Sequence, residues 1–180
     1  NMALVSGSSV STGSFGHITL SEGLEIGGVF KASLSNNDAG TSNTIFGKSA
    51  GASLDAGSNF NVFIGEEVSD AAMDDAINNV GVGYQALSAL TTGDGNIAIG
   101  KGAGDAITTG DYNTAVGNLA LSAETTGAQS VAIGHSALTS QNSTGSADMF
   151  NTAVGASAGA AVTTGVNNTL IGGNAGDALT

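Results

Sequence analysis

Asn96-Ile-Ala-Ile-Gly100 is the clearest of eight similar five-residue segments in this chain of 180 residues. Each segment opens with Asn or Ser and closes with Gly, and residues that are mostly apolar or Thr lie between them. The segments begin at residues 43, 61, 79, 96, 113, 130, 151 and 168. Their glycines are 18, 18, 17, 17, 17, 21 and 17 residues apart. A fixed period of this length predicts a solenoid in which each repeat buries its apolar face against its neighbours.

The alternation within each segment is typical of a short β-strand whose side chains point to opposite faces. The fourth residue is always large and apolar, and we expect this face to fill the core. The predicted core residues are Phe46, Ile64, Val82, Ile99, Val116, Ile133, Val154 and Ile171. The middle residue is Gly or Ala in five copies, so the other face is expected to approach a neighbouring surface closely.

The residue that opens each segment predicts a structural role. Identical Asn side chains in successive coils can form a ladder of hydrogen bonds, and Asn tolerates a tight turn before a strand. The repeat asparagines are Asn43, Asn61, Asn79, Asn96, Asn113, Asn151 and Asn168, and Ser130 takes their place in the sixth copy.

The remainder of each unit is patterned less strictly. Ala or Val stands three residues after each Gly, and turn signals such as Thr108-Thr-Gly110 follow in five copies. This part fits either a helical turn or a second strand. The long interval is assigned to an insertion at 146–150. The chain therefore divides into an N-terminal β-strand connector at 1–42, with strands at 17–20, 23–27 and 29–34, and an eight-copy repeat at 43–180.

Composition excludes several classes of function. Fifteen acidic residues against three basic ones give a net charge of −12, which disfavours nucleic acids and anionic membranes as partners. No catalytic set can be assembled from His17 and His135, and the chain has two tyrosines and no tryptophan to line the groove of a polysaccharide-processing enzyme. Asp94, Asn96, Asp105 and Asp111 carry oxygen ligands that calcium would accept, but no copy has the pattern of a calcium loop. We expect no enzyme activity, no cofactor and no metal site.

The segments Asn113-Thr-Ala-Val-Gly117 and Ser130-Val-Ala-Ile-Gly134 resemble the head repeats of trimeric autotransporter adhesins. The longer unit Gly83-Tyr-Gln-Ala-Leu-Ser-Ala-Leu-Thr-Thr-Gly93 is similar to repeat arrays of bacteriophage tail fibres. The resemblance covers 43–180 and extends loosely to 1–40. It implies an all-β, parallel β-roll that assembles as a homotrimeric fibre, in an extracellular or virion location.

Two functions remain open at this point. The first is a structural, self-assembling fibre, such as the shaft of a tail fibre or a similar appendage. The alternative is an adhesin or receptor-binding head that contacts a cell-surface glycan or protein. The expected partner is the chain itself, as a homotrimer, and head-to-tail filaments joined through the strands at 17–27 are a further option.

Overall fold

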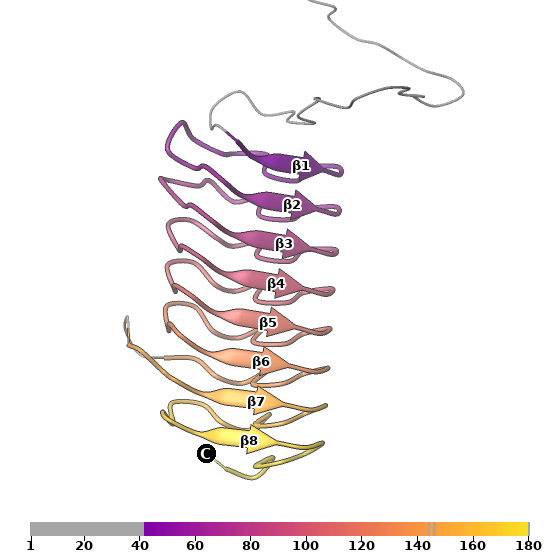
Figure 1. The fold of residues 1–180 in the computed structure, drawn as a ribbon, viewed down its shortest axis with the longest axis vertical. Helices are drawn as coiled ribbons and strands as arrows, with labels where there is room; N and C mark the ends of the chain where they lie inside the picture. Colours follow the sequence, from indigo (N-terminus) through magenta and orange to yellow (C-terminus); the bar gives the residue numbers. More distant parts are fainter. Residues whose placement is uncertain (1–41, 144, 146, 180) are drawn as a thin grey trace, which may run out of the picture. The chain divides into compact units, whose positions relative to one another are not determined.

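The computed structural model describes residues 42–179 except 144 and 146, and the connector strands predicted at 17–20, 23–27 and 29–34 lie outside these residues. The described part is an all-β solenoid in which each of the eight segments forms one three-residue strand (Figure 1). The strands are β1 (Thr44–Phe46), β2 (Val62–Ile64), β3 (Val80–Val82), β4 (Ile97–Ile99), β5 (Thr114–Val116), β6 (Val131–Ile133), β7 (Thr152–Val154) and β8 (Thr169–Ile171).

The eight strands form one parallel sheet in chain order, as the period predicted. Each residue pairs with the residue at the same place in the next coil; Ala98 of β4, for example, pairs with Ala115 of β5. The residues between strands form turns, and within the described residues no coil contains a helix or a second strand. Each coil thus consists of one short strand and a return path made of turns.

Backbone hydrogen bonds join the coils at both ends of each strand. The Thr114 amide donates to the carbonyl of Ser130 at 2.8 Å, and the Gly117 amide donates to the carbonyl of Ile99 at 2.8 Å. The return path is bonded in the same way, since the Leu119 amide donates to Lys101 O at 3.0 Å. Equivalent residues therefore stack in columns along the solenoid, about 4.8 Å apart.

The glycine that closes each strand is required by this stacking. Gly117 has a φ of 135°, which L-residues rarely adopt, and a Cβ on it would lie 2.5 Å from the carbonyl oxygen of Gly134. Gly100 and Gly134 are placed in the same way against the next coil. A side chain in this column would push two coils apart.

The interior of the solenoid is filled by the middle residue of each strand, which corrects the predicted core. Ala98, Ala115 and Ala132 are buried, whereas Ile99 and Ile133 are 41% and 38% exposed. The eight residues predicted to fill the core all point out of the chain: Phe46, Ile64, Val82, Ile99, Val116, Ile133, Val154 and Ile171. The two faces were separated correctly but assigned the wrong way round, because the middle residue of each strand faces the return path of its own coil, whatever its size.

Larger interior side chains fit because neighbouring positions compensate in volume. Phe63 of β2 is fully buried, and a Cβ on Gly81 of β3 would lie 3.3 Å from its ring and 2.6 Å from Val68 Cγ1. Leu87 is also fully buried and lies 3.4 Å from the place where a Cβ on Gly104 would be. Close packing of this kind makes each interior residue depend on the size of the residue one coil away.

The glycine column generates a first prediction. Gly117→Ala should destabilise the fold by roughly 2–5 kcal/mol, because the substitution adds both backbone strain and a clash with the next coil. Gly173→Ala is the control, because a Cβ there would lie 3.8 Å from its nearest neighbour, Ala156 O. Urea unfolding followed by circular dichroism would measure both variants. Equal midpoints for the two variants would contradict the role given to the glycine column.

Candidate interaction surface

The outward face of the sheet carries two columns of large side chains, which we name the apolar stripe. One column holds the last residue of each strand, and the other holds the first residue. The stripe consists of Thr44, Phe46, Val62, Ile64, Val80, Val82, Ile97, Ile99, Thr114, Val116, Val131, Ile133, Thr152, Val154, Thr169 and Ile171. Twelve of these sixteen residues are apolar, and all of them are partly or largely exposed.

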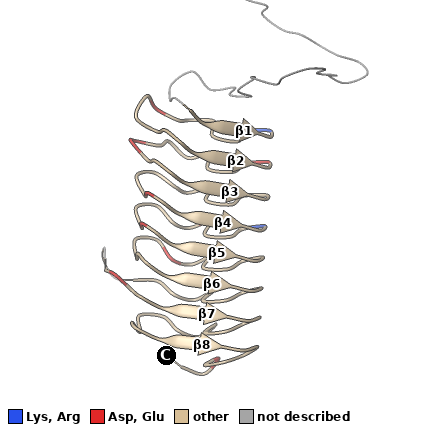
Figure 2. Ribbon diagram, viewed as in Figure 1, with Lys and Arg blue, Asp and Glu red and all other residues tan. Residues whose placement is uncertain are grey.

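The apolar stripe is long, continuous and free of charge. Eight strands at about 4.8 Å spacing make it roughly 38 Å long. Charged residues lie at the turns on either side of the strands, and the strands themselves carry none (Figure 2). Large exposed apolar patches are typical of surfaces that contact another molecule, so the stripe is the candidate interaction surface.

Residue size alternates along the column of the stripe that holds the last residue of each strand. From β2 to β8 the last strand residue is Ile, Val, Ile, Val, Ile, Val and Ile. The isoleucines at 64, 99, 133 and 171 are more exposed than the valines between them. The stripe therefore protrudes at every second coil, and this shape restricts the positions in which a second surface can pack against it.

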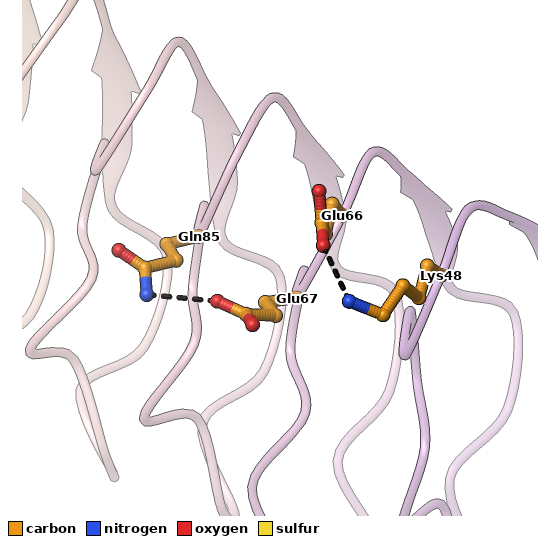
Figure 3. A network of polar contacts seen from close by, with 4 residues as sticks. All are labelled: Lys48, Glu66, Glu67 and Gln85. Atoms are coloured by element: carbon orange, nitrogen blue, oxygen red, sulfur yellow. Dashed lines mark hydrogen bonds and ion pairs between the residues drawn. The ribbon is translucent and has the colours of Figure 1, made fainter.

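The corner beside the stripe carries polar contacts between successive coils. Lys48 Nζ lies 2.8 Å from Glu66 Oε1, and Gln85 Nε2 donates to Glu67 Oε2 at 3.0 Å (Figure 3). The Glu66 hydrogen bond and its charge raise the pKa of Lys48. A hydrogen bond to Glu67 raises the pKa of Tyr84. These exposed pairs contribute little to stability, and their role is to keep the rim of the stripe hydrophilic.

The repeat asparagines form a ladder inside the solenoid. The amide of Asn96 donates to Asn79 Oδ1 at 2.9 Å, and Asn96 Oδ1 accepts the Asn113 amide at 2.9 Å. Asn96 Nδ2 also donates to the carbonyl of Gly110 at 2.8 Å, across the coil. The same pattern joins Asn43 to Asn61, Asn61 to Asn79, and Asn151 to Asn168. Each Asn satisfies backbone groups in two coils, so these residues are structural.

The ladder of Asn side chains is interrupted at Ser130, whose side chain is too short to continue it. Gln141 reaches into the gap: its Nε2 donates to Ser130 Oγ at 2.9 Å, and its Oε1 accepts Asn151 Nδ2 at 2.8 Å. Gln141 occupies the place that Leu90 and Ile107 hold in other coils. Ser130 in place of Asn removes hydrogen bonds from the ladder, and Gln141 in place of an apolar residue restores them.

Glu124 lies one coil before Gln141 and is also buried. Its carboxylate accepts Gln141 Nε2 at 3.0 Å, the Gly127 amide at 2.7 Å, and the amide and hydroxyl of Ser143 at 3.1 and 3.0 Å. Burial alone would raise the pKa of Glu124, but these hydrogen bonds outweigh it and hold the pKa below its usual value. The sequence analysis missed this network. The available signal was that Glu124 and Gln141 replace the apolar residue of their column in adjacent coils, and that Ser130 replaces the Asn between them.

Of the acidic residues considered as calcium ligands, Asp94 and Asp111 bond backbone amides, whereas the buried Oδ1 of Asp105 has no hydrogen-bond partner. Asp94 Oδ1 accepts the Ile77 amide and Asp111 Oδ1 accepts the Asp94 amide, both at 2.8 Å, while Asn96 belongs to the ladder. Burial raises the pKa of Asp105. Among the described residues, one acidic group of three, Asp55, Asp74 and Asp75, has carboxylate oxygens within 4.8 Å of one another. Asp55 Oδ1 already accepts the amides of Ser58 and Asp75, so we assign no metal site there.

His135 is exposed at the corner after β6, where other coils carry Lys101 and Asn118, and His17 lies outside the described residues. The insertion assigned to 146–150 precedes β7, with Met149 buried and Phe150 exposed. The interval of 21 residues exceeds 17 by four, so Phe150 takes the regular place before the repeat Asn and is not an inserted residue. Within residues 42–179, apart from 144 and 146, no helix is long and apolar enough to cross a membrane. Comparison with protein-family models, curated proteins and solved structures found no match.

The ladder generates a second prediction. Asn96→Ala should destabilise the chain by about 2–4 kcal/mol, because it leaves buried backbone groups of two coils without partners. The matched control is Asn118→Ala, which removes one exposed hydrogen bond of 3.2 Å to Lys101 O and should change stability by less than about 0.5 kcal/mol. Chemical unfolding of both variants tests this, and a small loss for Asn96→Ala would rule out a structural ladder.

Glu124 generates a third prediction, on pH dependence. A folded-state pKa below the usual value means that Glu124 stabilises the fold above the ordinary glutamate pKa of about 4.3. This contribution is lost as the pH falls through the folded-state pKa. Glu124→Gln should therefore be less stable than wild type at pH 7, and the difference should shrink in acid. Thermal unfolding from pH 7 to pH 3 measures it, and a difference that does not change with pH would contradict the assignment.

Proposed function

We propose that this chain is a structural fibre protein, a shaft segment of a phage tail fibre or a similar extracellular appendage, that assembles as a homotrimer through the apolar stripe. The observation that carries the proposal is the stripe itself: Ile99, Ile133 and their equivalents are large, apolar and exposed on the single chain. Full burial of a side chain of this size contributes about 1.5–3 kcal/mol, so covering the part of Ile99 and Ile133 that is still exposed, 41% and 38%, contributes about 1 kcal/mol each. A partner that covers the stripe would remove this surface from water.

The shape of the stripe favours copies of the same chain as the partner. Specific protein interfaces cover about 800 Å² on each partner. A stripe two columns wide and roughly 38 Å long approaches this area only if a surface of equal length lies along it. A second coil stack has the same coil spacing, so a contact made at one strand can be repeated at every strand.

Three chains around one axis explain the relief of the stripe. In a parallel trimer the same residue of each chain lies at the same height, so layers of three isoleucines would alternate with layers of three valines. The acidic turns would remain outside, in water (Figure 2). This arrangement agrees with the resemblance of the repeat to trimeric fibres, and it includes no catalytic step.

Assembly is tested by a charged substitution on the stripe. Ile99→Asp combined with Ile133→Asp should abolish the trimer, because carboxylates would enter a dry interface. The solenoid of each chain should remain folded, since both residues point away from the interior. Thr109→Asp is the matched control, because it adds a carboxylate at an exposed turn.

Light scattering coupled to size-exclusion chromatography gives the readout. Wild type and Thr109→Asp should have three times the chain mass of 17.3 kDa, and the double variant should have the mass of one chain. Circular dichroism would check that the double variant keeps its strands. A folded wild-type monomer at all concentrations would refute assembly, and a stable dimer would refute the threefold arrangement.

A further inference from the structure

A second exposed column runs along the solenoid, formed by the residue before each repeat Asn or Ser. All described members have left-handed backbone conformations, with φ between 50° and 65°. This edge column consists of Ser42, Phe60, Asn78, Gly95, Tyr112, Gln129, Phe150 and Asn167. The conformation belongs to the coil, because it recurs whichever residue occupies the position.

Three members of the edge column are aromatic and exposed. Phe60 is 59% exposed, Tyr112 65% and Phe150 48%. Left-handed backbone disfavours bulky residues and is adopted most easily by Gly and Asn, which occupy this column at 78, 95 and 167. Neither local conformation nor burial accounts for the rings. Buried leucines such as Leu87 and Leu121 are also left-handed, so the backbone alone does not mark a site; what distinguishes the edge column is that its rings are exposed.

Tyr112 is held in a defined position. A Cβ on Gly95 would lie 2.7 Å from Cδ1 of the Tyr112 ring, so the ring packs directly on the Gly95 backbone. The Tyr112 amide donates to Asp94 O at 2.8 Å, which fixes the column at this coil. Gly95 therefore makes room for a ring that lies along the solenoid and keeps much of its surface in water.

Rings and amide side chains follow one another along the edge column. Phe60 is followed by Asn78, Tyr112 by Gln129 and Phe150 by Asn167, and all three amide residues are partly or largely exposed. The coils are about 4.8 Å apart, close to the length of one sugar unit in an extended β-1,4-linked chain. Aromatic rings stack on the C–H faces of sugars, and amides bond to their hydroxyl groups.

We propose that the edge column binds an extended, neutral glycan that lies parallel to the long direction of the solenoid. Three rings with amides between them are too narrow to cover the roughly 800 Å² that a specific protein partner needs, whereas a glycan is one sugar wide. The net charge of −12 and the neighbouring Asp94 and Asp111 disfavour an anionic polysaccharide. The inference goes beyond the structural role and does not depend on the trimer.

The test uses the tyrosine content of the chain. The sequence has two tyrosines and no tryptophan, so Tyr84→Phe leaves Tyr112 as the only strongly fluorescent side chain. This variant is titrated with chitohexaose, with cellohexaose and with polygalacturonate. Saturable change of the Tyr112 emission is expected with at least one neutral hexamer and not with the anionic polymer.

A second comparison locates the site by calorimetry. The double variant Tyr112→Ala, Phe150→Ala should bind the neutral hexamer at least about tenfold more weakly than wild type, a loss of about 1.4 kcal/mol. Leu119→Ala is the matched control, because Leu119 is 38% exposed and also left-handed but lies after the strand, outside the edge column. It should bind like wild type. The oligomeric mass of all three proteins should be equal.

Four outcomes would overturn the proposal. The first is no saturable binding of either neutral hexamer, and the second is wild-type affinity in the double variant. The third is binding of polygalacturonate as tight as that of the hexamers, which would contradict a neutral ligand. The fourth is a changed oligomeric mass in the double variant, which would place the rings in a contact between copies of the chain; the stripe variants test assembly separately.

Discussion

In-register hydrogen bonding between successive coils is the interaction on which the rest of this structure depends. Because Gly117 N bonds to Ile99 O, and every coil repeats the bond, each position of the 17-residue unit becomes a column with one set of requirements. The strand-closing column needs glycine, since a Cβ would strike the next backbone. The Asn column must donate and accept in both directions. The abundance of small residues in the sequence follows from the requirements of these columns and does not indicate a disordered chain.

The same constraint explains which features could be predicted from the sequence. The spacing of glycines gave the coil period, and alternation gave the eight strands, because both depend on neighbours along the chain. The inside of the strands could not be predicted from size alone. Ala98 and Ala115 are inside because the return path lies close behind the strand; at the equivalent Gly81, a Cβ would lie 3.6 Å from Ala86 O of the same coil. The distance between the two walls of a coil is a tertiary property, so Ile99 was taken for a core residue although it faces out.

The candidate surfaces differ in how far the sequence reveals them. The apolar stripe was visible as a column of large residues, and only its direction was wrong. The edge column is not visible, because Phe60, Asn78, Gly95 and Tyr112 share no side-chain property. What they share is a backbone conformation, which becomes apparent only once the coil is built. A column that varies freely in sequence is also the place where a repeat protein can acquire a ligand without disturbing its stacking.

Near-identical coils bring a difficulty of their own, because β3, β4 and β5 offer almost the same partner and pairing with the wrong coil costs little. The hydrogen-bonded network of Glu124, Ser130 and Gln141 distinguishes one pairing from the others. If β6 paired one coil out of place, Gln141 would keep Ser130 of its own coil, but Glu124 would lose the donors from Gln141 and Ser143. A buried carboxylate without these donors is strongly unfavourable. In the proposed trimer the alternation of Ile and Val would act similarly between chains, because a shift by one coil would place isoleucines of one chain at the height of valines of the next. Departures from the repeat therefore specify the register that the repeat itself leaves open.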